Sequence, residues 1–126
     1  HIRRQKATSN ICSNQSLMAL FVTVYMAVMG KKGVKEAGEL SYAGAHYMMD
    51  KLVETGKFKP TFDKPFFNEF CVKYNGDVDR LQQRFIENGI LGGVKVDADT
   101  LMFAVTEKRT KEEIDKLVNI AKEEKL

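Results

Sequence analysis

Cysteine thiols and histidine imidazoles, which could bind a metal ion, are the first candidates for chemistry in this sequence, and they are few. They are His1, Cys12, His46 and Cys71, and no two of them lie within four residues of each other. Zinc sites draw on local pairs of ligands, such as two cysteines separated by two residues. The spacing therefore predicts no metal site, and His46 is better interpreted as a partly buried packing residue.

Two acidic pairs are the next candidates, because closely spaced carboxylates can bind calcium. Asp77 and Asp79 form one pair, and Asp97 and Asp99 form the other. Neither pair continues into the spaced oxygen ligands and terminal Glu of a calcium loop. Helix capping and turn formation explain both pairs more simply.

A glycine-rich segment at residues 89–93 has the composition of a phosphate-binding loop but not its spacing. Gly89, Gly92 and Gly93 match neither the P-loop nor the dinucleotide-binding fingerprint, and no helix follows them directly. The segment predicts the end of a helix, at Gly89, followed by a bulged strand.

Nucleophilic chemistry has two weak candidates. Cys12 would need a base to activate it, and the sequence offers no specific partner. Lys6 is a conceivable Schiff-base lysine, because neighbouring cations such as Arg3 and Arg4 lower the pKa of an amine. The residue types and their spacing thus indicate no reaction.

The composition is that of one soluble globular domain. The chain has 126 residues, of which 44% are hydrophobic and 29% are charged, and its net charge is +3. Its lysines are scattered among acidic residues, which argues against a nucleic-acid partner. Two distant cysteines do not make a disulfide scaffold, so we expect reduced thiols in a cytoplasmic protein.

The elements that must position these residues begin with two helices. Residues 17–29 are apolar except for Thr23, and Gly30 follows them. This segment is too short to span a bilayer and apolar nearly all round, so we expect part of its surface to meet another domain or subunit. A second helix is predicted over residues 34–55, ended by Gly56. Its buried stripe is Val34, Ala37, Ser41, Gly44, Met48 and Leu52, with Gly38 and Gly44 allowing close helix packing.

The remaining elements alternate between strands and helices. After a loop at residues 57–65, period-two alternation predicts a strand over residues 66–74. Next comes a helix capped by Asp77, followed by strands at 90–96 and 101–106. The last helix begins at the capping box Thr110–Glu113. These elements predict an α+β fold of two layers, with a small, mostly antiparallel sheet covered on one face by helices.

Six segments of the sequence, in the same order, resemble the P-protein family of the glycine cleavage system. The first fifteen residues, HIRRQKATSNICSNQ, are the most specific of them. The others are residues 30–33, 45–47, 67–70, 88–90 and 105–110. The resemblance covers essentially the whole chain, in the half that corresponds to the first subunit of the two-subunit form.

The resemblance implies a place in a larger enzyme. The family has a fold-type I, pyridoxal-phosphate-dependent architecture, in which a small C-terminal domain packs against a large domain. Residues 1–14 would then be the connecting segment from a large domain outside this sequence, and residues 15–126 the small domain. The start at His1, within a motif, suits a piece of a longer chain, and the C-terminus resembles a natural end.

The resemblance also implies an activity and partners. The family decarboxylates glycine and passes the aminomethyl group to the lipoyl arm of the H protein. The Schiff-base lysine and pyridoxal phosphate belong to the second subunit, so this chain would hold no cofactor and Lys6 would not form a Schiff base. The partners implied are the chain's own large domain, the second subunit and the lipoylated H protein, with no nucleic acid and no membrane.

Polar residues near the N-terminus are the candidates for an interface or a substrate channel. They are Arg3, Arg4, Lys6, Thr8, Ser9 and Asn10. The cations could attract anionic groups such as the carboxylate of glycine. The hydroxyl and amide side chains could instead satisfy backbone groups at a helix entry.

Two other classes of protein remain open on the residues alone. One is the small domain of another fold-type I enzyme, such as an aminotransferase. The other is a non-catalytic interaction module, because a fold does not fix a function.

Overall fold

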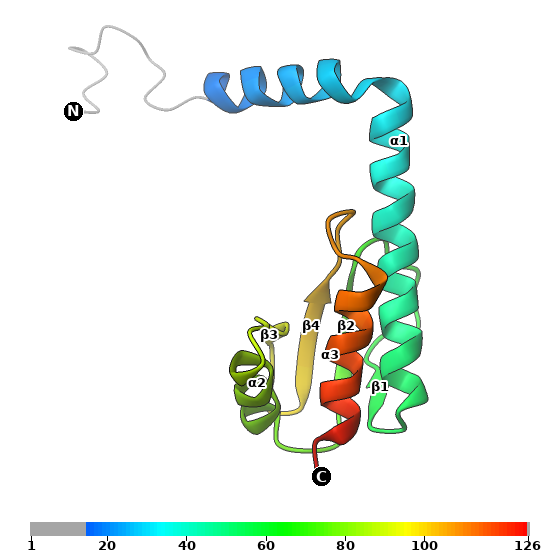
Figure 1. The fold of residues 1–126 in the computed structure, drawn as a ribbon, viewed down its shortest axis with the longest axis vertical. Coiled ribbons are helices and arrows are strands. Elements are labelled where there is room, and N and C mark those ends of the chain that lie inside the picture. Colours follow the sequence, from blue (N-terminus) through cyan, green and yellow to red (C-terminus); the bar gives the residue numbers. More distant parts are fainter. Residues whose placement is uncertain (1–14, 126) are drawn as a thin grey trace, which may run out of the picture. The chain divides into compact units, whose positions relative to one another are not determined.

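The computed structural model describes residues 15–125 of the chain. The chain divides into two compact units, residues 1–34 and residues 35–126. Helix α1, Ser16–Glu54, begins in the first unit and continues into the second, and Gly30 interrupts it with non-helical backbone angles (Figure 1). The two helices predicted on either side of Gly30 are therefore two helical runs of one element. The proposed connecting segment, residues 1–14, lies outside the described residues.

The second run of α1 forms because one stripe of it is buried. Ser41, Ala45, Met48 and Leu52 recur at helical spacing and are all buried. The predicted stripe is confirmed at Ser41, Met48 and Leu52 but is wrong at Val34, which is exposed because it precedes the part of the helix that the domain covers. Gly56, with φ of 74°, follows the end of α1 as expected.

Four short strands form one antiparallel sheet in the order β1-β2-β4-β3. Their bounds are β1 Phe58–Pro60, β2 Glu69–Tyr74, β3 Val94–Lys95 and β4 Thr100–Ala104. The prediction of a loop over residues 57–65 was wrong for β1. This strand lies at the edge of the sheet, where Pro60 is tolerated because an edge position needs no further hydrogen-bond donor.

Two of the predicted strands were too long. The strand expected at 66–74 begins at Glu69, since Phe66 stacks on a helix residue, His46. The strand expected at 90–96 contains only Val94 and Lys95, since Gly93 directly before it has φ of 75°, which is not an extended conformation. The strand expected at 101–106 is observed at residues 100–104, and its hairpin with β3 is confirmed.

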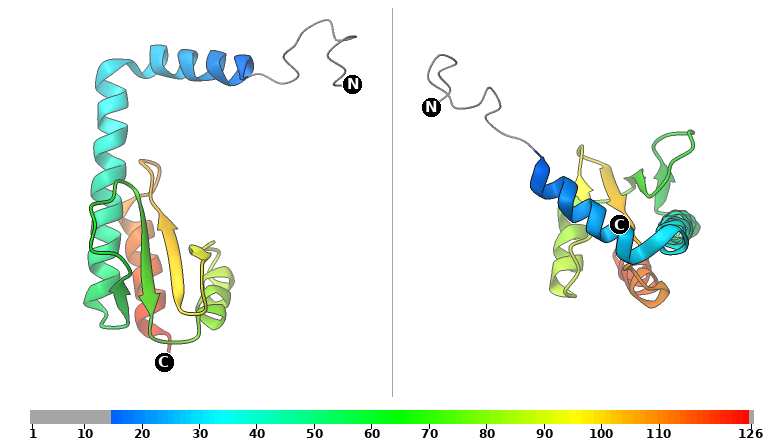
Figure 2. Two further views of the ribbon diagram at one scale, coloured as in Figure 1. Left: turned by 180° about the vertical axis from the view of Figure 1, so that it is seen from behind. Right: turned by 90° about the horizontal axis from the view of Figure 1, so that it is seen from above.

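The hydrophobic core lies between the sheet and the helices. Phe70 of β2 pairs with Phe103 of β4, and helices α2 and α3 lie on the same face of the sheet as the second run of α1 (Figure 2). Helix α2, Val78–Glu87, contributes Leu81 and Phe85, and helix α3, Lys111–Glu123, contributes its apolar stripe. The expected α+β fold of two layers is confirmed.

The helix entries follow the sequence signals closely. Asp77 caps α2 by accepting hydrogen bonds from the backbone N–H groups of Asp79 and Arg80, at 2.9 and 3.1 Å. Thr110 and Glu113 form a reciprocal capping box at the start of α3, with distances of 3.3 and 2.9 Å. Both predicted caps are confirmed.

Glycine is required where another element passes close to the backbone. A Cβ atom at Gly92 would lie 2.2 Å from Cδ2 of the fully buried Phe85. A Cβ atom at Gly44 would lie 3.0 Å from Val105, which follows β4, but at an ordinary 3.8 Å from Ile114 of α3. Gly44 therefore allows close packing, as expected, but against the segment after β4 and not against a helix. Gly38 has only an ordinary neighbour, the ring of Phe67 at 3.9 Å.

Candidate assembly surface

The polar residues that the sequence nominates as a site lie outside the described part of the chain. They are Arg3, Arg4, Lys6, Thr8, Ser9 and Asn10. Their role at an interface or substrate channel therefore stays a prediction. The site that the structure does describe is an apolar surface on the first run of α1.

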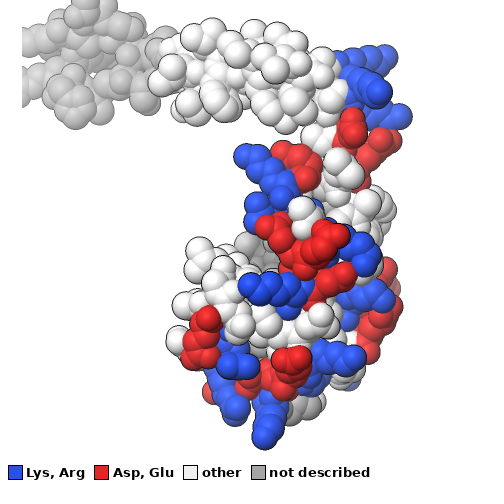
Figure 3. Space-filling model, in the orientation of Figure 1, with Lys and Arg blue, Asp and Glu red and all other residues white. Residues whose placement is uncertain are grey.

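The first run of α1, residues 16–29, is a helix whose apolar side chains are exposed. Leu17, Phe21 and Val28 are 71%, 65% and 79% exposed. The other exposed apolar side chains of this run are Met18, Leu20, Val22, Val24, Tyr25 and Met26. Figure 3 shows no charged side chain on this run, and the sequence has none between Ser16 and Met29. The structure leaves this apolar surface exposed, and its expected contact with another domain or subunit stays a prediction.

The apolar surface extends around the whole circumference of the run. Successive residues of a helix are rotated by about 100°, so Leu20, Phe21 and Met26 point about 100–140° apart. After Ser16, only Thr23 and Tyr25 carry a polar group, and the Thr23 hydroxyl donates a hydrogen bond to the carbonyl of Ala19 at 2.7 Å. The Thr23 hydroxyl therefore needs no outside partner, and apart from the Tyr25 hydroxyl the whole circumference of this run suits an apolar environment.

By length and composition alone, α1 qualifies as a helix that could cross a membrane. Its uncharged part ends at Gly30, however, and Lys31 and Lys32 follow. Residues 16–29 extend over roughly 21 Å at 1.5 Å per residue, which is short of the roughly 30 Å of a hydrocarbon core. The dimensions therefore favour a protein partner for this surface.

Gly30 sets the end of the apolar run through its backbone. Its φ of 62° and ψ of 177° fall in a region that is essentially restricted to glycine. A Cβ atom there would meet no heavy atom within 4 Å, so the restriction comes from the backbone and not from packing. The run ends at this residue because the next turn of the helix cannot continue from these angles.

We expect Gly30→Ala to join the two runs into one continuous helix. Alanine in the observed conformation would cost about 1–3 kcal/mol, whereas alanine in a helix is favourable. Circular dichroism should show an increase in helix content. Gly38→Ala is the matched control, because this position is already helical and has room for a Cβ atom. It should raise stability by up to about 1 kcal/mol without adding helix, and an unchanged spectrum for Gly30→Ala would contradict this account.

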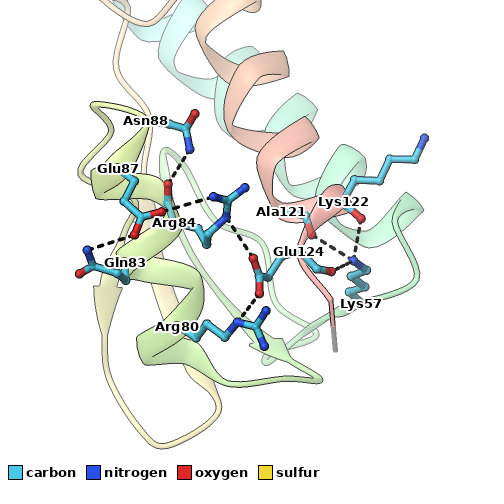
Figure 4. A network of polar contacts seen from close by, with 9 residues as sticks. All are labelled: Lys57, Arg80, Gln83, Arg84, Glu87, Asn88, Ala121, Lys122 and Glu124. Atoms are coloured by element: carbon cyan, nitrogen blue, oxygen red, sulfur yellow. Dashed lines mark hydrogen bonds and ion pairs between the residues drawn. The ribbon is translucent and has the colours of Figure 1, made fainter.

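The second unit, residues 35–126, is held together at its C-terminal end by a network of polar contacts (Figure 4). The side chain of Glu124 is 4% exposed and lies between two arginines of α2. Its Oε1 is 2.7 Å from Arg80 Nε and its Oε2 is 3.3 Å from Arg84 Nε. The Oε1 contact is an ion pair without the alignment of a hydrogen bond. These contacts join the end of α3 to α2.

Lys57 completes this network from the other side. Its amine donates hydrogen bonds to the carbonyls of Ala121 at 3.3 Å and Lys122 at 2.6 Å, and also to the carbonyl of Glu124. The last carbonyls of a helix lack partners within the helix, and a cation there also interacts favourably with the helix dipole. Sequence reasoning missed this network, because no local pattern connects Lys57 with residues more than 60 positions away.

A second polar cluster joins α1 to α3. The Tyr47 hydroxyl donates a hydrogen bond to Asp115 Oδ1 at 2.6 Å, and Lys111 Nζ lies 2.8 Å from Asp115 Oδ2. The hydrogen bonds from Lys111 and Tyr47 lower the pKa of the Asp115 carboxyl. The same bond to Asp115 raises the pKa of Lys111 above its ordinary value.

The cluster predicts a pH dependence of stability. Because the pKa of Asp115 is lower in the folded state, its contribution is complete above the ordinary carboxyl pKa of about 3.9 and is lost as the pH falls through the folded value. We expect Asp115→Asn to destabilise the domain at neutral pH and to have a vanishing effect in strong acid. Urea titrations of both proteins across this range measure the difference. A difference that grows on acidification would contradict this assignment.

His46 is a packing residue, as expected. Its ring stacks on Phe66 with centroids 4.0 Å apart and planes 6° apart, and Tyr42 lies on it at the same centroid distance. His46 Nε2 is 3.2 Å from the Phe66 carbonyl. This contact fixes the loop before β2 onto α1.

The other candidates for chemistry have structural roles within the described residues. No group of three or more His, Cys, Asp or Glu side chains is close enough there to hold a metal ion, while His1 and Cys12 lie outside that range. Asp79 pairs with Lys95 at 2.7 Å, and Asp99 pairs with Lys73 at 3.0 Å. Gly89 ends α2 with φ of 76°, as expected.

One pocket of the second unit is lined by polar groups that already have partners within the protein. It has a volume of about 460 Å³, and its walls are mostly apolar. Arg109 on its rim lies 3.4 Å from Glu113, and Lys116 donates a hydrogen bond to the Asn88 carbonyl at 2.9 Å. The polar groups are therefore turned toward protein atoms and do not converge on a ligand.

A compact two-layer α+β domain joined to an uncovered apolar helix is typical of a domain that packs within a larger protein. The family model of the glycine cleavage system P-protein matches residues 1–121. The chain belongs to the glycine cleavage system P-protein family. The alternative of a small domain from an aminotransferase is therefore not supported.

Similar proteins support the same family. The "Probable glycine dehydrogenase (decarboxylating) subunit 1" of Carboxydothermus hydrogenoformans is 49% identical over 126 residues, which cover 95% of this chain and 28% of the relative. The protein of the same name from Geobacillus thermodenitrificans is 47% identical and is covered to the same 28%, with 94% of this chain matched. The chain thus spans little more than a quarter of the length of these relatives.

A solved structure supports the fold. The crystal structure of glycine decarboxylase (P-protein) of the glycine cleavage system, in inhibitor-bound form, matches with a TM-score of 0.83 and 34% sequence identity. The match covers 97% of this chain and 29% of that chain.

Proposed function

We propose that this chain is the C-terminal small domain of a glycine dehydrogenase (decarboxylating) subunit 1, and that its role is assembly of the enzyme. The support is the family membership, the subunit name carried by relatives at 41–49% identity, and the coverage of little more than a quarter of their length. The observation that carries the assembly role is the exposed apolar run 16–29 next to a domain with its own core.

The intact enzyme would decarboxylate glycine and pass the aminomethyl group to the lipoyl arm of the H protein, in the cytoplasm. Its partners would be the large domain of the same polypeptide, a second subunit that holds pyridoxal phosphate, and the lipoylated H protein. When bound, the cofactor supplies the electron sink for loss of the carboxylate. This domain would contribute structural support, with neither nucleic acid nor membrane as a partner.

Three lysines of the described region have contacts that do not suit a Schiff base with a cofactor. A Schiff-base lysine needs a neutral amine beside the cofactor. The amine of Lys57 instead donates to three backbone carbonyls. Hydrogen bonds to carboxylates raise the pKa of both Lys51 and Lys111, which keeps these amines protonated. These residues do not fit pyridoxal phosphate.

Cofactor titration of this chain tests the proposal. We expect no change in the visible absorbance of pyridoxal phosphate beyond that given by free lysine at equal concentration, and no release of labelled carbon dioxide from glycine. The intact polypeptide, mixed with the second subunit and the H protein, should exchange carbon dioxide with the glycine carboxylate. Saturable cofactor binding by this chain alone, or no exchange by the complete mixture, would contradict the proposed function.

A further inference from the structure

The core of residues 35–126 is complete without the apolar run of α1. Every buried residue of the described region lies between Ser41 and Glu124, and none lies between residues 15 and 34. The two compact units of the chain meet at residues 34 and 35, a few positions after the break at Gly30. The run 16–29 therefore adds no buried side chain to the α+β domain.

A single flat partner cannot cover this run. A helix that lies on one surface buries a stripe somewhat wider than about 100°, with polar residues on its opposite side. Here Leu20, Phe21 and Met26 are 61%, 65% and 51% exposed and point in three different directions. A second copy of the run packed against it would leave much of both circumferences in water. A helix that is hydrophobic all round is instead a core helix of a larger structure.

We propose that residues 16–29 are a core helix of the large domain, enclosed by it on all sides, and that the boundary between the domains lies at residues 30–34 instead of after residue 14. This inference rests on the proposed function, which makes a large domain part of the same polypeptide. The relatives are long enough to contain such a large domain, because this chain covers only 28% of their length. Gly30 then separates an element of one domain from the helix of the next.

Thiol labelling on three sides of the run tests the enclosure. Leu20→Cys, Phe21→Cys and Met26→Cys would be made singly, with Cys12 and Cys71 replaced by serine, both in this chain and in the intact polypeptide. Ellman's reagent measures the rate of labelling. At a dilution at which this chain does not associate, we expect all three thiols to react readily in it. Each should react on the order of 100-fold more slowly in the intact polypeptide, where labelling requires local opening.

Leu40→Cys is the matched control. This leucine is 53% exposed on the second run of α1, so its thiol should react readily in both proteins. If any one of the three positions stays reactive in the intact polypeptide, the run is covered on one side only and the inference is wrong. Equal protection of all three in this chain at the same dilution would show that residues 35–126 cover the run without a large domain, which also overturns the inference.

Two further measurements keep the result interpretable. Hydrogen exchange of the unsubstituted intact polypeptide should show slow exchange over residues 16–29, whichever cysteine variants fold, and fast exchange there would contradict enclosure. Exchange of carbon dioxide with glycine, measured on the same preparation with the second subunit and the H protein, reports on the proposed function alone. An active enzyme with a reactive thiol refutes the enclosure, whereas an inactive protein with three protected thiols refutes the function.

Discussion

Replacing Phe85 by alanine is expected to lower the free energy of unfolding of residues 35–126 by about 3–5 kcal/mol. Phe85 is fully buried on α2, and Gly92 lies against its ring with no room for a side chain. The loss combines the transfer of a large apolar side chain with the cavity that it leaves. At about 4–8 °C per kcal/mol for a domain of this size, the melting temperature should fall by more than about 10 °C.

Phe62→Ala is the matched control, because this phenylalanine is 66% exposed and should change stability by less than about 0.5 kcal/mol. Gly92→Ala should also destabilise the domain, by about 1–3 kcal/mol, since its Cβ atom would overlap the Phe85 ring. In the Phe85→Ala background the overlap is gone, so Gly92→Ala should cost much less there. Additive effects in this double-mutant cycle would show that the two residues are not in contact.

The second large effect is expected on the apolar run of α1. This chain on its own should associate in solution, because the run exposes a large apolar surface. Replacing both Phe21 and Val28 by aspartate places two charges on one side of the run, and burying unpaired charges is unfavourable by several kcal/mol. Association should weaken at least about tenfold, which corresponds to 1.4 kcal/mol. Sedimentation velocity over a concentration series measures the change.

Leu40→Asp is the control for this pair of substitutions. Leu40 is an exposed apolar residue of the same helix, beyond Gly30, and its replacement should leave association unchanged. A chain that sediments as a monomer at all concentrations before any substitution would contradict the prediction. In the intact polypeptide the Phe21 and Val28 substitutions should prevent assembly and not improve solubility.

The sequence was sufficient to predict those features of the structure that depend on residues close together in the chain. Asp77 and Thr110 were identified as helix caps because the cap and the backbone groups that it satisfies lie within three residues of each other. The break at Gly30 could be predicted because glycine follows an apolar run that only Thr23 interrupts. The apolar surface could also be predicted, since no arrangement of polar residues along residues 17–29 gives the helix a side that faces water.

Elements that depend on distant partners could not be predicted from local pattern. β1 has only three residues, and its strand conformation comes from pairing with β2, where Phe58 lies opposite Tyr74. Glu124 looked like part of a frayed, charged end, yet its carboxylate is buried because α2 brings Arg80 and Arg84 to it. The spacing of these residues in the sequence contains no information about that contact.

The order of synthesis gives the separation at Gly30 a consequence for the nascent chain. Residues 16–29 leave the ribosome before residues 35–126 do, and translation of the latter at about 5–20 residues per second takes roughly 5–20 s. The later residues contribute no buried contact to the apolar run. During those seconds the apolar run therefore has to be buried by polypeptide that was synthesised earlier or bound by a chaperone. The C-terminal domain can fold afterwards, independently of the run.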